Sequence, residues 1–211
     1  SPFDLAAATL KQIQRETEHA QAGRPARIIA KMNALLDKNV IQALYHASQA
    51  GVTIDLIVRG MCSLRPRVPG VSDNITVRSI VGRFLEHSRI FYFANGGDEQ
   101  MQISSADWMP RNLYERVEVL CPVLDPNLRQ RLKDEVLAAY LADNVKVRFL
   151  DRNGRYSHLP RSRGTVAFSA QDFLIALAEG SATAADIPEP VHPPAVRTRA
   201  RKPRQVAARR G

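Results

Sequence analysis

One histidine stands among several arginines near the middle of the chain, a combination that suits phosphate chemistry. His87 sits just before an apolar run in the stretch 84-FLEHSRIFYFANGGDEQMQISSADW-108. Arginine side chains bind phosphate oxygens through paired charge-assisted hydrogen bonds, and a histidine beside them can transfer a proton or carry a phosphoryl group. A lone histidine before a strand is more often structural or exposed than catalytic, so both interpretations stay open. The basic residues that could converge with it are Arg59, Arg65, Arg67, Arg83 and Arg89.

Further polar side chains could support such a site. Lys31 and Asn33 end the first predicted strand, and they could reach the same place or only finish the strand at the surface. Ser104 and Asp107 follow the apolar run; they could orient a histidine, but capping of the next turn is the safer interpretation. The sequence has no P-loop motif and no glycine-rich dinucleotide motif after a strand, so neither of these folds is supported.

The apolar periodicity predicts an α/β domain that positions these residues. Strand, helix and strand follow one another over residues 26–33, 37–49 and 52–58, a βαβ unit with parallel strands. The loop 59–74 leaves the carboxyl end of the second strand, where ligands of open α/β sheets gather. Residues 88–94 and 101–106 predict a hairpin that begins just after His87. We also expect helices over 4–22, 125–141 and 170–179, and strands over 76–81, 116–123 and 145–150.

The composition predicts one good-sized domain with a basic tail. The chain has 211 residues, 45% of them hydrophobic, and a net charge of +9. Residues 190–211 carry seven basic residues and no acid, so subtracting these charges leaves +2 for residues 1–189. Cys62 and Cys121 are expected to be reduced, buried thiols. No signal peptide or membrane-spanning run is found, so we expect a soluble cytoplasmic protein, and the start at Ser1 indicates a fragment or a processed chain.

Several long strings of the sequence are distinctive, among them DLIVRGMCSLRP, SSADWMPRN and RVEVLCPVLDP. Through them the chain, from about Ser1 to Glu179, resembles the C-terminal region of bacterial polyphosphate kinases. The resemblance implies a phospholipase D type of α/β fold, with a mixed, mostly parallel sheet flanked by helices and a disordered basic C-terminal tail. We expect residues 1–24 to be a helix and linker from a preceding domain, 25–180 the C-terminal domain, and 181–211 the tail.

The resemblance also implies an activity and roles for single residues. The family reversibly transfers the terminal phosphate of ATP to growing polyphosphate. Arg59 and His87 match family positions that contact the ATP phosphates, and His87 is the expected general acid or base opposite a phosphohistidine of the preceding domain. His87-x-Arg89 and Ser104-Ser105-x-Asp107 stand where the phospholipase D fold has His-x-Lys and a turn with Ser and Asn. The expected supporting residues are Lys31, Asn33, Arg89, Ser104 and Asp107.

Partners and cofactors follow from the same resemblance. ATP or ADP, inorganic polyphosphate and the remaining domains of the same enzyme are the expected partners, and we expect a homo-oligomer. Mg²⁺ enters with ATP and is bound mainly by the preceding domain, so no metal ligand is assigned in this chain. Because the phosphorylated histidine has no matching segment here, the chain alone is expected to bind ATP or polyphosphate weakly and to turn over negligibly.

Two other classes of function remain as alternatives. The basic residues after Pro190 could bind nucleic acid or another polyanion through its phosphates, although they include no aromatic side chain for base stacking. A phospholipase-D-like phosphodiesterase would use His87 as its nucleophile, and it would need a partner histidine in a second copy of the motif. His19, His46, His158 and His192 lack that motif.

Overall fold

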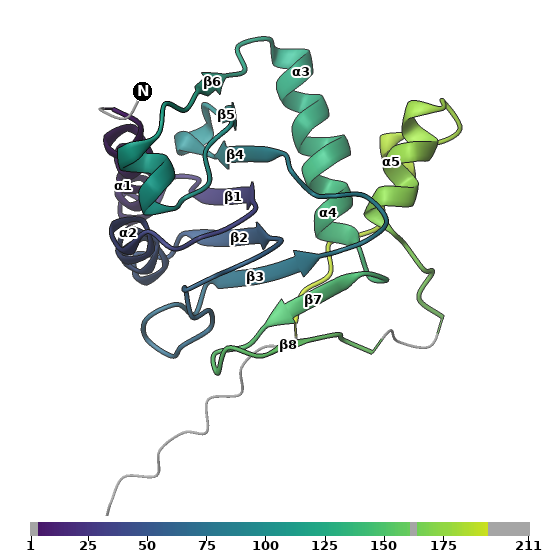
Figure 1. The fold of residues 1–211 in the computed structure, drawn as a ribbon, viewed down its shortest axis with the longest axis horizontal. Helices are drawn as coiled ribbons and strands as arrows, with labels where there is room; N and C mark the ends of the chain where they lie inside the picture. Colours follow the sequence, from purple (N-terminus) through teal and green to yellow (C-terminus); the bar gives the residue numbers. More distant parts are fainter. Residues whose placement is uncertain (1–3, 161–163, 194–211) are drawn as a thin grey trace, which may run out of the picture.

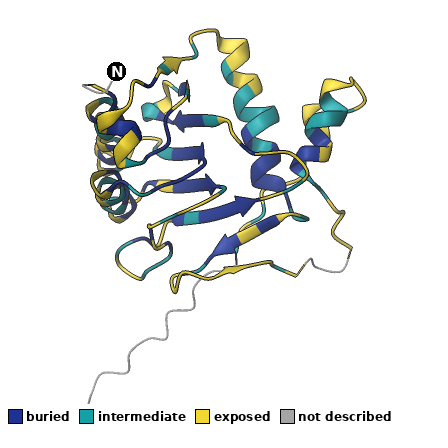
Figure 2. Cartoon of the chain, in the orientation of Figure 1, coloured by how far each residue is buried: buried dark blue, intermediate teal, exposed yellow. Residues whose placement is uncertain are grey.

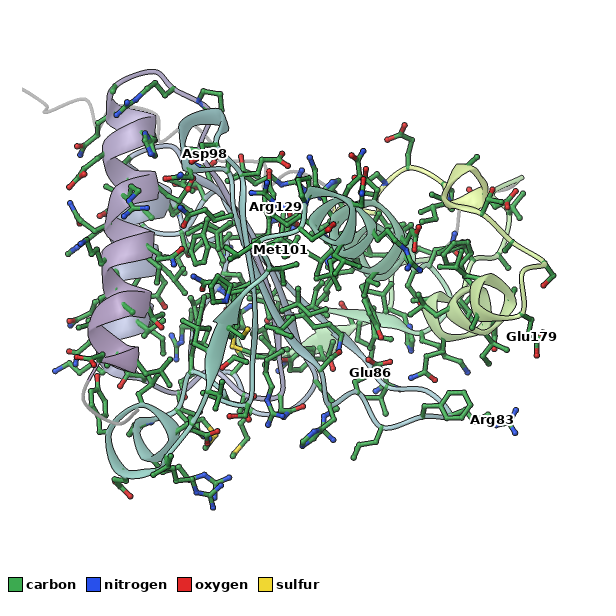
Figure 3. All side chains as sticks on the ribbon, turned by 90° about the horizontal axis from the view of Figure 1, so that it is seen from above. Arg83, Glu86, Asp98, Met101, Arg129 and Glu179 are labelled. Atoms are coloured by element: carbon green, nitrogen blue, oxygen red, sulfur yellow. The ribbon has the colours of Figure 1, made fainter. Side chains whose placement is uncertain are left out.

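The structure, a computed structural model, describes residues 4–160 and 164–193. Eight strands form one sheet with helices on both sides (Figure 1). Viewed from above, the helix α1 (Leu5–Gln21) lies on one side of the sheet, and the helices between residues 126 and 178 lie on the other side (Figure 3). The part of the predicted tail from residue 194 onward lies outside the described residues. The fold is therefore an α/β domain of three layers, as the sequence predicts.

Both the parallel unit and the hairpin are found in the sheet. The strands lie in the order β6-β5-β4-β1-β2-β3-β7-β8. The neighbours β1, β2 and β3 are parallel, and the other five of the seven pairings are antiparallel. Their bounds are β1 Arg27–Met32, β2 Thr53–Val58, β3 Ile75–Ile80, β4 Arg89–Phe93, β5 Gln100–Ser104, β6 Leu120–Pro122, β7 Val147–Leu150 and β8 Tyr156–Ser157.

The predicted mixed sheet is confirmed, but the expectation that it is mostly parallel is wrong. Short turns join β4 to β5 and β7 to β8, and a short turn can connect only antiparallel neighbours. In addition, β4 enters the sheet beside β1 in the antiparallel sense, with Ile28 opposite Phe93. The parallel pairing therefore stays confined to the three central strands.

Two helices from the first quarter of the chain cover one face of the sheet. The helix α1 spans Leu5–Gln21 and α2 spans Lys38–Gln49. Asp37 starts α2, because its carboxylate accepts a hydrogen bond from the Val40 N–H at 2.9 Å. Alternate side chains of β1, Ile28 and Met32 among them, pack against these helices. The predicted βαβ unit is confirmed.

Helices from the second half cover the opposite face. The segments α3 (Pro126–Arg131), η3 (Leu132–Leu137) and α4 (Ala138–Ala142) follow one another directly, and α5 spans Ala170–Ala178. These helices pack against the strand side chains that point to this face of the sheet. Together they form a second core, which contains Ile29, Tyr92, Leu137, Tyr140 and Phe173. Figure 2 shows the central strands mostly buried between the layers and β8 exposed. The predicted helices over 125–141 and 170–179 are confirmed.

Some segments differ from the prediction. The strand expected over 116–123 is shortened to β6, because Glu118 turns inward to accept hydrogen bonds from Ser105 and Asn112. Of the two thiols that were expected to be buried, Cys121 is exposed on this edge strand. The elements that the periodicity did not predict are the turn of π-helix η2 (Arg111–Glu115), the strand β8 and two 3₁₀ turns, η1 (Asn95–Gly97) and η4 (Ala184–Asp186).

Residues 181–193 lie against the domain. Ile187 and Val191 pack on the second core, and the Val191 N–H donates to the Leu141 carbonyl at 2.9 Å. Within the described part of the chain, no helix combines the length and the hydropathy that a membrane span requires.

Candidate phosphate-binding site

A cavity of about 990 Å³ opens at the carboxyl ends of the three parallel strands. Asn33 follows β1, Arg59 follows β2, and residues 81–87 follow β3. The start of β4 and the segment after β5 close the other side through Arg89 and Asp107. This is the edge of an α/β sheet at which ligands bind in open sheets, as the sequence predicts.

Asp107 links the two sides of this cavity. Its carboxylate accepts hydrogen bonds from the backbone N–H of Asn33 at 2.7 Å and from the Asn33 side chain at 3.2 Å. It also accepts two from Arg89, at 3.1 and 3.2 Å. Burial raises the pKa of Asp107, but the hydrogen bonds from Arg89 and Asn33 outweigh it and hold the pKa below its usual value. Asp107 is therefore an ionised anchor for Arg89.

His87 lies at the exposed rim of the cavity, next to Arg89. Arg89 Nη1 donates to the His87 carbonyl at 3.0 Å and lies 3.2 Å from His87 Nδ1. The chain of contacts from Asn33 through Asp107 and Arg89 thus ends at the imidazole. This chain of contacts joins four of the sequence-predicted residues: Asn33, His87, Arg89 and Asp107.

Lys31 supports the segment that carries His87 from below and does not line the cavity. Its ammonium group is buried, 3.0 Å from Glu86 Oε2 and 2.8 Å from Ser88 Oγ. Tyr140 and Gln171 also donate hydrogen bonds to the Glu86 carboxylate. Burial raises the pKa of Glu86, but the hydrogen bonds from Gln171, Tyr140 and Lys31 bring it below its usual value. The backbone on both sides of Glu86 is thereby tied to the second core.

The outer part of the same segment reaches beyond the body of the domain. Gln171 exchanges hydrogen bonds with the backbone of Phe84, whose N–H donates at 3.0 Å and whose carbonyl accepts at 2.9 Å. Figure 3 shows Arg83 at the outer end of this loop and Glu86 closer to the helices. The side chains of Val81, Phe84 and Leu85 are exposed. The loop is therefore held by hydrogen bonds to Gln171, while the side chains at its tip are exposed to solvent.

Arg59 is held by its backbone while its side chain faces the cavity. Its N–H donates to the Met32 carbonyl at 3.2 Å, and its carbonyl accepts from Ser79 Oγ at 3.1 Å. Its Nε atom is buried and has no hydrogen-bond partner among the described residues. Buried polar atoms in proteins are normally paired, so Arg59 has capacity for a further hydrogen bond.

Ser104 has the capping role that was the alternative interpretation. Its hydroxyl donates to the Val119 carbonyl at 2.8 Å and accepts from the Ala106 N–H at 3.0 Å. Its neighbour Ser105 lines the cavity and donates to Glu118. Of the paired serines, the second one faces the site.

Sequence reasoning missed two arginines that line the cavity, Arg111 and Arg116. Arg111 is the first residue of η2 and Arg116 directly follows this element. The position of η2 opposite the loop 81–87 is set by a non-local return of the chain. The available signal was that these two arginines lie in the distinctive strings SSADWMPRN and RVEVLCPVLDP. Conversely, Arg65 and Arg67, which were expected nearby, do not line the cavity.

The balance of charge in the cavity favours an anion. Five arginines line it, against the three carboxylates of Glu86, Asp107 and Glu118. All three of these carboxylates already accept hydrogen bonds from neighbouring side chains. The described residues include no cluster of three or more His, Cys, Asp or Glu side chains placed to hold a metal ion. Guanidinium groups of this density suit phosphate oxygens.

Fold and cavity together define an α/β domain with an arginine-rich cavity at the carboxyl ends of its parallel strands. The family model for "Polyphosphate kinase C-terminal domain 2" matches residues 1–171. The polyphosphate kinases of Xylella fastidiosa (strain 9a5c) and Paraburkholderia phytofirmans are 54% and 58% identical to the chain over 175 residues, which is 83% of this chain and 25% of each relative. The crystal structure of polyphosphate kinase from Porphyromonas gingivalis superposes with a TM-score of 0.79 at 45% identity, covering 84% of this chain and 27% of that one.

The chain belongs to the polyphosphate kinase family, in which it corresponds to C-terminal domain 2. It spans about a quarter of the length of the relatives that it matches. The resemblance inferred from the strings around Arg59 and Asp107 is confirmed.

Proposed function

We propose that this chain supplies the phosphate-binding part of a polyphosphate kinase active site. In the whole enzyme, Arg59 would bind oxygens of the ATP phosphates, and His87 would act as general acid or base beside the transferred phosphoryl group. The observation that carries the proposal is that both residues line one arginine-rich cavity. They come from segments that are far apart in the sequence.

The chemistry requires mainly positioning and neutralisation of charge. In the proposed reaction the bond from the γ-phosphorus of ATP to the ADP oxygen breaks, and the phosphoryl group passes to the terminal oxygen of polyphosphate by way of a phosphohistidine in another domain. Negative charge spreads over the phosphoryl oxygens during transfer, and fixed guanidinium groups stabilise it without having to reorganise. Asp107 would hold Arg89 in place, so that Arg89 in turn orients the His87 imidazole.

Mg²⁺ would accompany the nucleotide in this proposal. The carboxylates of the cavity are engaged by Lys31, Arg89, Ser105 and Asn112. We therefore assign no ligand for the ion in this cavity and propose, from the family resemblance, that the phosphates and another domain of the enzyme bind it. By the same resemblance, we propose that the enzyme is a cytoplasmic homo-oligomer. Residues 25–180 would form the domain proper, and residues 1–24, whose helix α1 packs on it, its connection to the preceding domain. Residues 181–211 would be its tail, the first part of which, 181–193, packs on the second core.

The test uses the whole enzyme with His87→Ala and with Arg59→Ala. Removal of a residue that stabilises the transition state is expected to lower the synthesis rate by about 100-fold or more. His46→Ala, which removes an exposed histidine of α2, serves as the matched control and should keep the rate. Near-normal rates from both site variants would contradict the proposal. The 211-residue chain alone should bind ATP weakly and produce no polyphosphate, and robust synthesis by it would show that the nucleophile lies within it.

A further inference from the structure

A second hollow of about 530 Å³ adjoins the first cavity and shares Arg59 with it. It lies beyond β3, over the edge of the sheet that β7 and β8 form. The polar side chains that line it are Arg59, Ser79, Lys146, Arg148, Tyr156 and His158. None of the described residues that line it is acidic. We call it the β7–β8 groove.

The topology of the sheet places these cations in a row. Arg148 on β7 lies opposite Ser79 on β3, and Ser79 Oγ donates to the carbonyl of Arg59. Lys146 directly precedes β7, and Arg148 Nε donates to Nε2 of His158 at 3.1 Å, just after β8. Lys146 and Arg148 are exposed. The row therefore starts at the candidate phosphate site and runs outward to solvent.

We propose that the β7–β8 groove binds the phosphates of a polyphosphate chain that lie beyond the reacting end, with Arg59 at the junction. This inference rests on the proposed function, because it extends the same site. A nucleotide triphosphate has only three phosphates, and the first cavity holds enough arginines to bind them. A groove with three further basic side chains and no carboxylate suits a longer polyanion, because each added phosphate brings a charge that needs a counter-charge. Nε of Arg59, which has no hydrogen-bond partner in the described part of the chain, would donate to the phosphate that lies where the two hollows meet.

The experiment tests whether removing positive charge from the groove weakens the binding of long polyphosphate chains more than that of short ones. Binding of tripolyphosphate and of long-chain polyphosphate to the 211-residue chain would be measured by calorimetry for the double variant Lys146→Ala/Arg148→Ala. The matched control is Lys11→Ala/Arg24→Ala, which removes the same charge from exposed positions on and just after α1. Loss of two exposed charge contacts should weaken long-chain binding about tenfold. Binding of tripolyphosphate should change by less than about twofold, and the control should change neither.

The outcomes separate this inference from the proposed function. If Arg59→Ala weakens both ligands but the groove variant weakens neither, the groove is not a polyphosphate site, although the proposed function stands. If Arg59→Ala weakens neither ligand, the proposed function fails together with the inference. Equal weakening by the groove variant and the control would show a general charge effect and overturn the groove. A single-stranded RNA oligonucleotide that binds as tightly as long-chain polyphosphate, and equally depends on Lys146 and Arg148, would assign the groove to nucleic acid instead.

Discussion

The guanidinium of Arg89 donates from Nε to Asp107 Oδ1 at 3.1 Å and from Nη2 to Asp107 Oδ2 at 3.2 Å. This bidentate pair joins the start of β4 to the segment after β5. The third nitrogen of the same group, Nη1, remains directed at His87. A lysine could not make all of these contacts, because it carries a single nitrogen at its end. An arginine at position 89 therefore has a geometric role that a lysine could not fill.

Replacement of Asp107, which anchors Arg89, should lower the free energy of unfolding by an amount that depends on pH. Asp107→Asn leaves Arg89 nearly buried without its anion and should lower the free energy of unfolding by about 3 kcal/mol near neutral pH. Because the pKa of Asp107 is depressed in the fold, its contribution is present above the ordinary aspartate pKa and is lost as the pH falls through the folded value. The difference between wild type and variant should therefore shrink below about pH 4. Urea unfolding across this range measures it, with the exposed Asp98→Asn as control; a difference that grows at low pH would contradict the assignment.

Loss of the ion pair between Lys31 and Glu86 should destabilise the chain, and a second substitution should recover part of the lost stability. Glu86→Gln leaves the buried ammonium group of Lys31 without a counter-ion, which should cost about 3–5 kcal/mol. Replacing the lysine as well, in Lys31→Met/Glu86→Gln, should restore part of that stability. Burial lowers the pKa of Lys31, so the unfolded chain binds the extra proton and stability rises with pH towards the ordinary lysine value. Relative to wild type, the single variant should therefore be less destabilised at alkaline pH. A double variant less stable than Glu86→Gln would refute this account.

A glycine packed against Gln171 provides a test of how the loop is held. A Cβ atom at Gly82 would lie 2.4 Å from Gln171 Oε1, so the amide that holds Phe84 would have to move. Gly82→Ala should destabilise the chain by about 1–3 kcal/mol. In a Gln171→Ala background the same change should cost close to nothing, a coupling of about 1 kcal/mol or more. Thermal or urea unfolding of the wild type, the two single variants and the double variant measures this coupling. Additive effects would show that Gln171 does not restrain the loop.

The two thiols should differ in reactivity. Burial raises the pKa of Cys62 to about 11, although its backbone hydrogen bond with Leu64 acts in the opposite direction. The thiolate is the reactive form, so at about pH 8 iodoacetamide should modify the exposed Cys121 and spare Cys62 until the chain unfolds. Since the folded pKa of Cys62 is raised, its thiol favours the fold below the ordinary cysteine pKa, and this contribution is lost as the pH rises towards 11. Mass spectrometry of labelled Cys121→Ser is the control; rapid modification of this folded variant would contradict the partial burial and raised pKa of Cys62.

The sequence was sufficient for most of the architecture, because local patterns govern it. Alternation and helical periodicity located β1, α2 and β2, and the Asp37 cap marked where α2 begins. The hairpin of β4 and β5 followed from its turn residues. The sense of the remaining pairings depends on which distant strands meet, and periodicity carries no such information. The sheet was therefore predicted as more parallel than it is.

In the candidate site, too, the features that depend on local sequence were predicted and those that depend on tertiary contacts were not. His87 was found because it is a histidine among several arginines, and Arg59 and Asp107 because they sit in distinctive strings. The cavity does bring all three to one place. The turn cap of Ser104 was the safer interpretation of the sequence, because it is a local contact with the Ala106 N–H. The role of Lys31 was not predictable, since its buried ion pair with Glu86 depends on tertiary contacts. Arg111 and Arg116 were missed for the same reason, because no local pattern directs η2 towards the loop 81–87.

The placement of β4 beside β1 has a consequence for how the chain is made. During synthesis β1, β2 and β3 leave the ribosome first, and β1 then has an open edge of unpaired backbone groups until residues 89–93 arrive. Pairing of Ile28 with Phe93 closes a long loop, which slows folding relative to a sheet built from sequential neighbours. We therefore expect the cavity to assemble last, and chains interrupted before β4 to aggregate through the edge of β1.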